Sequence, residues 1–139
     1  MTMNVEHARH AMIEQQIRPW DVTDMRVLGA LAAVPRERFV PELHKALAFA
    51  DTALPIGHGE RMLKPVLEGR LLQALELQPN DEVLVIGTGS GFLTACVATL
   101  ARAVTSIDRH ADFLDAAKAK LAALDLNNVR FEQAEAMAF

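Results

Sequence analysis

The chain has 139 residues, of which 51% are hydrophobic, and this is enough material for the buried core of one domain. Its formal net charge of -4 does not favour binding to nucleic acid, and the sequence has no run of basic residues that could form a local positive patch. The single cysteine, Cys96, excludes a disulfide framework and favours a reducing cytoplasm.

The first third of the chain is predicted to form two helices. Pro19 ends the first helix, Thr23 can cap the second, and Pro35 stops it. The apolar residues that recur at helical spacing are Ala8, Ala11, Met12 and Ile17 in the first helix, and Met25, Leu28, Leu31 and Ala32 in the second.

The segment 36–64 contains prolines and glycines that break regular structure, so we predict that it is irregular. Pro65 then suits the first position of a third helix, because proline lacks the N–H that would be unpaired there. Leu67, Leu71 and Leu75 are expected to form the buried stripe of this helix.

The pattern changes after residue 77. The apolar run EVLVI predicts a strand covered on both faces, and the strands AVTSI and VRFEQ follow it. Helices are predicted over about 92–102 and about 111–124. In the second of these the inward-facing residues are Phe113, Ala117, Leu121 and Leu124. Alternating strands and helices of this length indicate an α/β fold with a parallel sheet.

Right-handed crossovers place the three strands in the order three, two, one, which leaves strand 83–86 with an unpaired side. Open sheets of this kind normally continue past that strand, so we interpret the chain as the first half of a doubly wound domain. A complete three-strand domain is the alternative. The predicted division is a helical segment, 1–64, followed by the truncated domain, 65–139. We expect the unpaired side of strand 83–86 to drive self-association.

A membrane interpretation is disfavoured. Residues 83–101 carry no charge, and Gly87 and Gly91 have the spacing of a transmembrane helix interface. The middle of this stretch is GTGSG, however, which is a poor and polar helix. The start, MTMNVEHARH, is too polar for a signal peptide. We therefore predict a cytoplasmic protein that contacts neither membrane nor nucleic acid.

The stretch VLVIGTGSGF joins the first strand to its helix. Glycines let the backbone approach a ligand, and the helix N-terminus offers unpaired N–H groups to an anionic or polar group. The dinucleotide fingerprint needs its third glycine at position 92, but that position is Phe92, so nicotinamide and flavin dinucleotides are disfavoured. Asp108 ends the second strand, where a carboxylate can accept from both ribose hydroxyls. Glu135 is a further acid on the same rim.

Together with the segments VPRERFVP and ALPIGHGE, this pattern resembles the protein-L-isoaspartate O-methyltransferases. The resemblance covers nearly the whole chain. It implies a Rossmann-like fold and S-adenosylmethionine as the cofactor. The substrate would be the free carboxylate of an isoaspartyl residue in a damaged protein or peptide, which is methylated to begin repair. The residues that it places at the cofactor are Gly87, Thr88, Gly89, Ser90, Gly91, Asp108 and Glu135.

Two departures from the family pattern bear on activity. Val85 stands where the family has an acid, V-L-E-I-G, and valine cannot hold the ammonium end of the cofactor. In the family pattern G-x-T-I-S-Q-P the substrate-contacting positions fall on Arg61 and Leu63, so no catalytic residue can be assigned. Arg61 and Lys64 could bind a carboxylate, although an ordinary basic loop is the simpler interpretation.

Two functions therefore stay open. The first is methyl transfer to isoaspartyl residues; the second is a non-catalytic or altered-substrate relative that serves as a cofactor-binding or interaction module. The histidines include no compact set for a metal site, since His7 and His10 lack further nearby ligands. The sequence leaves undetermined whether the chain is active, what its true substrate is and what its native oligomeric state is.

Overall fold

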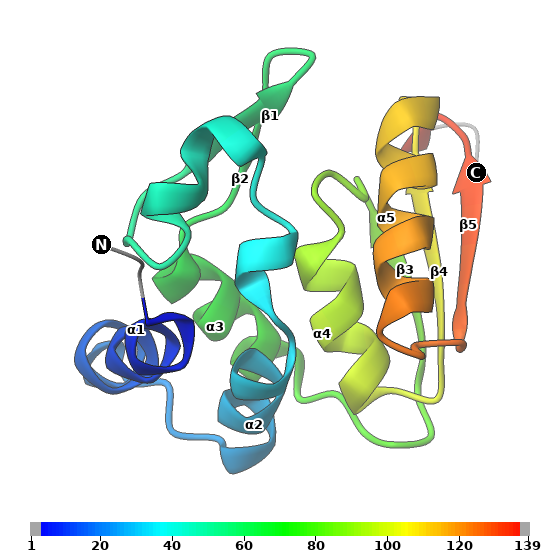
Figure 1. Cartoon of the computed structure of the whole chain (residues 1–139). Coiled ribbons are helices and arrows are strands. Elements are labelled where there is room, and N and C mark those ends of the chain that lie inside the picture. Colours follow the sequence, from blue (N-terminus) through cyan, green and yellow to red (C-terminus); the bar gives the residue numbers. More distant parts are fainter. Residues whose placement is uncertain (1–3, 137–139) are drawn as a thin grey trace. The chain divides into compact units, whose positions relative to one another are not determined.

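The computed structural model describes residues 4–136 and divides into two compact units, with the boundary between Glu76 and Leu77 (Figure 1). The sequence places the boundary earlier, between residues 64 and 65. The helix that follows Pro65 groups with the first unit, because its buried side packs on residues that precede it in the chain. None of the helices in the described residues combines the length and the apolarity needed to cross a membrane.

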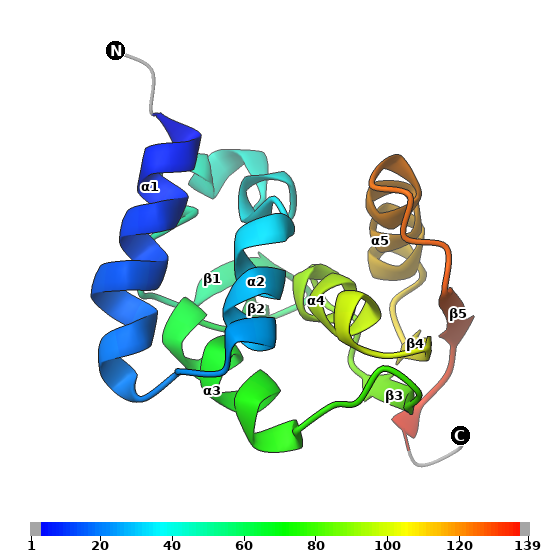
Figure 2. The ribbon, with the colours of Figure 1, turned by 90° about the horizontal axis from the view of Figure 1, so that it is seen from below.

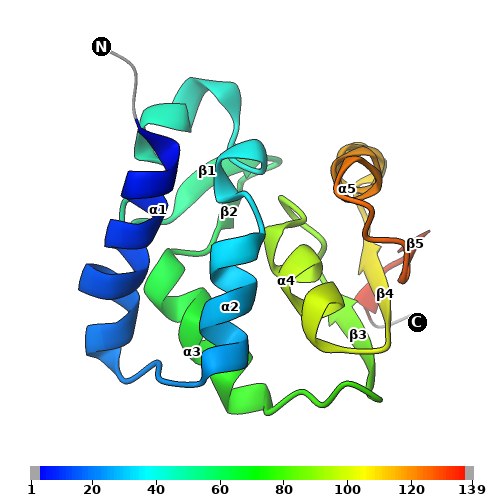
Figure 3. The same cartoon turned by 60° about the horizontal axis from the view of Figure 1, so that its bottom comes forward.

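The first unit contains the predicted helices and several short helical turns (Figure 3). The α-helices are α1 (Val5–Met12), α2 (Met25–Ala33) and α3 (Pro65–Leu75). A π-helical turn, η1 (Ile13–Ile17), prolongs α1, and the remaining turns are η2 (Arg18–Trp20), η3 (Arg36–Arg38) and η4 (Glu42–Leu47). Helices α2 and α3 pack on each other and on η1.

Helix α2 is capped by Asp24, so the prediction of Thr23 was wrong. The Asp24 carboxylate accepts from the N–H groups of Arg26 at 2.8 Å and Val27 at 3.3 Å, which satisfies two donors of the first turn. The N–H of Thr23 instead donates to the side chain of Gln73 at 2.8 Å. The same Gln73 oxygen also accepts from the N–H of Asp24 at 2.9 Å, so the chain before α2 is held by a residue that lies far along the sequence.

Two residues assigned to the apolar face of α2 are exposed, Met25 and Ala32, while Leu28 and Leu31 are buried as predicted. The error is larger in α3, which begins at Pro65 as predicted. Its expected buried stripe lies on the outside: the residues concerned are Leu67, Leu71 and Leu75, which are 40%, 40% and 55% exposed.

The buried side of α3 carries Glu68, Gly69 and Leu72. Glu68 faces the interior because the guanidinium of Arg36, itself buried, forms an ion pair with it. Gly69 allows α3 to lie close to η1, since a Cβ there would stand 3.0 Å from Cγ2 of Ile17. The buried charge pair and the small residue, and not the spacing of the leucines, thus determine which face of α3 is buried.

The segment predicted to be irregular contains an antiparallel hairpin, β1 (Leu54–Gly57) and β2 (Glu60–Met62). Its turn has positive φ at Gly57, His58 and Gly59, at 106°, 54° and 74°. Glycine at two of these positions makes the left-handed backbone available without a steric penalty. The two glycines therefore form a tight turn between two strands.

The second unit has the predicted α/β architecture. Its strands are β3 (Glu82–Ile86), β4 (Ala103–Asp108) and β5 (Val129–Gln133), which are parallel in the order β3-β4-β5, as predicted. Helices α4 (Phe92–Leu100) and α5 (Ala111–Ala123) cover the same face of this sheet (Figures 1 and 2). This common side is expected when every crossover is right-handed and runs in one direction.

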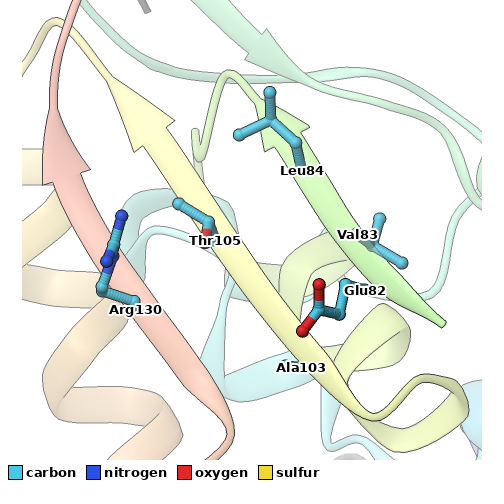
Figure 4. Close-up of a pocket in the computed structure, with 6 residues that line it drawn as sticks. All are labelled: Glu82, Val83, Leu84, Ala103, Thr105 and Arg130. Carbon is cyan, nitrogen blue, oxygen red and sulfur yellow. The ribbon is translucent and has the colours of Figure 1, made fainter. Parts of the chain in front are cut away.

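Strand β3 is not covered on both faces, contrary to the prediction from its apolar run. Side chains alternate between the faces of a strand, and Leu84 and Ile86 are 45% and 60% exposed on the face opposite the helices. A hollow of about 330 Å³ lies on that face, where Leu84, Thr105 and Arg130 come from three adjacent strands (Figure 4). Within the described residues, β3 also has no strand on its outer side.

Candidate functional site

The loop 87–91 connects the end of β3 to the start of α4. Gly87, Gly89 and Gly91 have φ of 92°, 54° and 89°, values that residues with a Cβ rarely adopt. A Cβ at Gly87 would meet nothing within 4 Å, so the backbone conformation and not a lack of space requires glycine there. The main chain of Gly87 is exposed and can be approached by a ligand.

Three successive residues at the end of β4 hold this loop. The carbonyl of Ile107 accepts from the N–H groups of Gly87 at 2.9 Å and Thr88 at 3.0 Å. On one side of it, the hydroxyl of Ser106 lies 2.6 Å from that of Thr88, and on the other the carboxylate of Asp108 accepts from the Gly89 N–H at 3.1 Å. The glycine loop and Asp108, which the sequence relates only by distance along the chain, are therefore in direct contact.

Asp108 is buried, and both of its carboxylate oxygens are used. One accepts from Gly89 and the other from the N–H of His110 at 2.9 Å, just before α5 begins. Each carboxylate oxygen has a second lone pair, so the group can still accept from a further donor. Glu135 is exposed beyond β5, one residue after Ala134, whose N–H donates to the Asp108 carbonyl at 3.0 Å.

Sequence reasoning missed the polar interior beneath the loop. Thr88, which the resemblance places at the cofactor, directs its hydroxyl into the core, and the hydroxyl of Thr94 lies 2.9 Å from that of the same Ser106. One signal was available: the alternation along β4 puts Ser106 on the same face as the buried Val104, where an apolar residue is expected. Ser90 differs from Thr88, since its hydroxyl accepts from the N–H of Phe92 at 3.3 Å.

Arg61 and Leu63, the positions at which the resemblance predicts substrate contact, lie in the first unit, in and just after the hairpin. Arg61 is exposed on β2, and the carbonyl of Leu63 accepts from the guanidinium of Arg36 at 3.0 Å. Lys64 lines a cavity of about 190 Å³ together with Trp20 and Arg70, and Arg61 is not among its lining residues. The binding of a carboxylate by Arg61 and Lys64 stays a prediction.

Arg36 fixes the path of this segment through several bonds. Its Nε donates to the Ala48 carbonyl at 2.8 Å, and its terminal nitrogens bond to the Glu68 carboxylate and to the Leu63 carbonyl. Burial raises the pKa of Glu68 to about 7, against the opposing effect of the Arg36 charge. The main chain at Leu63 is therefore held from inside the unit.

Comparison with known proteins gives a consistent set of relatives. The sequence profile described as "Protein-L-isoaspartate(D-aspartate) O-methyltransferase (PCMT)" matches residues 7–138. Protein-L-isoaspartate O-methyltransferase 1 from Rhodopseudomonas palustris (strain HaA2) is 42% identical over 91% of this chain and 52% of its own length. Protein-L-isoaspartate O-methyltransferase from Dictyoglomus thermophilum is 37% identical over 94% of this chain and 59% of its own length.

A solved structure of a protein-L-isoaspartate O-methyltransferase has the same fold, with a TM-score of 0.74 over 94% of this chain and 42% of that one, at 21% identity. The chain spans about half the length of the curated relatives it matches, 52% and 59% for the two named above.

Proposed function

Because the chain belongs to the protein-L-isoaspartate O-methyltransferase family, we propose that it takes part in methyl transfer to the free carboxylate of L-isoaspartyl residues in damaged proteins. The observation that carries this proposal is the hydrogen bond between the Gly89 N–H and the Asp108 carboxylate. It joins a glycine loop at a helix N-terminus to an acid at the end of the neighbouring strand. That arrangement suits a ligand with a polar chain and a ribose.

The residues present fit S-adenosylmethionine in most respects. The exposed main chain at Gly87 admits a close approach, and the spare lone pairs of Asp108 can accept from ribose hydroxyls. Glu135 lies on the same rim, for the adenine side. One position does not fit, because Val85 cannot accept a hydrogen bond from the ammonium group. The absence of the family's acid at this position would weaken the affinity for S-adenosylmethionine by about tenfold to a hundredfold.

The chain's own residues would orient the reactants. When bound, S-adenosylmethionine supplies a methyl group on a positively charged sulfur. The isoaspartyl carboxylate is already ionised at neutral pH, so the transfer asks for alignment and exclusion of water and needs no general base. Asp108 would fix the ribose, and the segment around Arg61 and Leu63 would contact the peptide.

A non-catalytic or altered-substrate relative is the second candidate function, and the residues that favour it are Leu63 and Val85. Leu63 lacks the hydroxyl of the family's serine, and only its main-chain carbonyl is held by Arg36. We also propose a cytoplasmic location, supported by the presence of a single cysteine in the sequence, Cys96, which is buried. The unpaired side of β3 supports the prediction of self-association, which stays a prediction.

Calorimetric titration with S-adenosylmethionine tests the proposed cofactor, with NAD as the comparison. We expect heat with the first only. Asp108→Asn should weaken binding by about tenfold to a hundredfold, because a charge-assisted contact to the ribose is lost. Asp115→Asn is the matched control, since Asp115 is exposed on α5. Absence of heat with S-adenosylmethionine, or equal affinity in Asp108→Asn, would contradict the proposal.

Methyl transfer to an isoaspartyl peptide separates the two candidate functions. We expect Leu63→Ser to raise the rate if the missing hydroxyl limits activity. If the parent chain binds S-adenosylmethionine but neither protein methylates the peptide, the non-catalytic relative becomes the better description.

A further inference from the structure

Three buried hydroxyl groups meet beneath the glycine loop. Thr88, Thr94 and Ser106 are 4%, 0% and 0% exposed, and Ser106 is the central member. Its Oγ lies 2.6 Å from Oγ1 of Thr88 and 2.9 Å from Oγ1 of Thr94. Both distances are those of good O–H···O hydrogen bonds. Each of the three hydroxyls therefore has a hydrogen-bond partner within the cluster, in a buried region.

The three members come from three different elements. Thr88 belongs to the loop, Thr94 to the first turn of α4, and Ser106 to β4. Successive side chains of a strand point to opposite faces of the sheet. Ser106 projects to the face covered by α4, and its neighbours in register are Val85 on β3 and Phe131 on β5. The hydroxyl cluster thus fastens the loop and the start of its helix to the strand that ends in Asp108.

We propose that Thr88 and Ser106 are positioning residues for the methyl donor, acting through the main chain of the glycine loop. This rests on the proposed function. Neither hydroxyl is accessible to a ligand, so neither reacts or binds directly. Their bond fixes Thr88 from one side, while the Ile107 carbonyl fixes its N–H at 3.0 Å. The next residue, Gly89, is then held with its N–H directed at Asp108.

A hydroxyl pair suits this task better than an apolar contact. A hydrogen bond has a preferred distance and direction, whereas apolar packing tolerates sliding. Removing the Ser106 hydroxyl takes this bond from both Thr88 and Thr94, whereas removing the Thr88 hydroxyl leaves Ser106 bonded to Thr94 alone. In either case a buried hydroxyl loses a partner that water cannot replace. The loop can therefore leave its position only by breaking bonds that nothing else in the interior replaces.

The test compares substitutions at Thr88 that remove the hydroxyl with substitutions that keep it. Thr88→Val keeps the shape and removes the hydroxyl, while Thr88→Ser keeps the hydroxyl and removes a methyl group. Thr105→Val is the matched control, because Thr105 is the neighbour of Ser106 on β4 and lies on the opposite face of the sheet (Figure 4). Calorimetry with S-adenosylhomocysteine, the unreactive product of the donor, measures affinity, and chemical denaturation measures stability.

We expect Thr88→Val and Ser106→Ala to bind about tenfold more weakly, with Thr88→Ser and Thr105→Val within about twofold of the parent chain. The proposal is overturned if Thr88→Val binds as tightly as the parent. It is also overturned if Thr88→Ser loses as much affinity as Thr88→Val, since packing of the methyl group would then explain the effect.

Amide hydrogen exchange tests the positioning role without a ligand. The Gly89 N–H should exchange about tenfold faster in Thr88→Val than in the parent chain, with protection in β5 unchanged. Unchanged exchange at Gly89 would overturn the positioning role. If the parent chain does not bind S-adenosylhomocysteine, the proposed function fails, and the exchange result still decides whether the hydroxyls hold the loop.

Discussion

In the first unit, side chains bond to main-chain atoms far away in the sequence, whereas in the second unit a parallel ladder of main-chain bonds sets the architecture. Arg36 alone reaches Ala48, Leu63 and Glu68. In the second unit, β3, β4 and β5 pair residue by residue without a bulge. The first unit therefore depends on a few particular side chains, while the strand order of the second depends on a pattern that many sequences can satisfy.

The substitution with the largest expected effect is Arg36→Met. It leaves the carboxylate of Glu68 buried without its partner, and breaking such a pair costs about 3–5 kcal/mol of unfolding free energy. The measurement is urea denaturation followed by the fluorescence of Trp20, which is the only tryptophan and lies in the first unit. The double variant Arg36→Met with Glu68→Leu should be less destabilised than Arg36→Met alone. Equal destabilisation would show that the lost arginine bonds to main-chain carbonyls dominate.

The pH dependence of stability should also distinguish the units. Burial raises the pKa of Glu68 from 4.5 to about 7, so the folded chain keeps this proton to higher pH than the unfolded chain. The free energy of unfolding therefore falls as pH rises between these two values, by up to about 3 kcal/mol, and levels off above them. In Glu68→Gln this decline should disappear from the Trp20 transition. A decline of the same size in Glu68→Gln would assign it to other groups.

A smaller effect is expected at the start of α2. Asp24→Ala removes the cap seen in the structure and should cost about 1 kcal/mol. Thr23→Ala is the matched control and should cost much less, because only the main-chain N–H of Thr23 is used. Thermal or urea unfolding of both variants decides the point. The reverse ranking would restore the cap that the sequence suggests.

The second unit was largely predictable from its sequence, and the reason is physical. Its strands and helices alternate with clear periodicity, and right-handed crossovers then leave one strand order, which the structure confirms. The glycine spacing likewise located the loop, and the length of the second strand located Asp108. The hydroxyl cluster was missed because Ser106 and Thr94 look like ordinary polar residues until the register of the strands is known.

The first unit was predictable only in outline. Its helices were located, but Leu67, Leu71 and Leu75 were assigned to the interior and lie outside. Periodicity alone shows that leucines share a face; it does not show that a charged residue on another face has a buried partner. That partner, Arg36, is thirty-two positions from Glu68, and no local pattern connects the two. The cap of α2 was missed for a different reason: Thr23 and Asp24 are adjacent residues that can both cap a helix, and the structure uses Asp24.

The attachment of the loop to three successive residues of β4 makes the loop depend on the register of β4 against β3. If β4 slipped by one residue against β3, Ser106 and Asp108 would exchange faces with their neighbours and all three attachments would be lost together. A ligand that recognises the attached loop would therefore bind only chains whose strands are correctly aligned. By mass action such a ligand would stabilise the aligned chain relative to any chain with shifted strands.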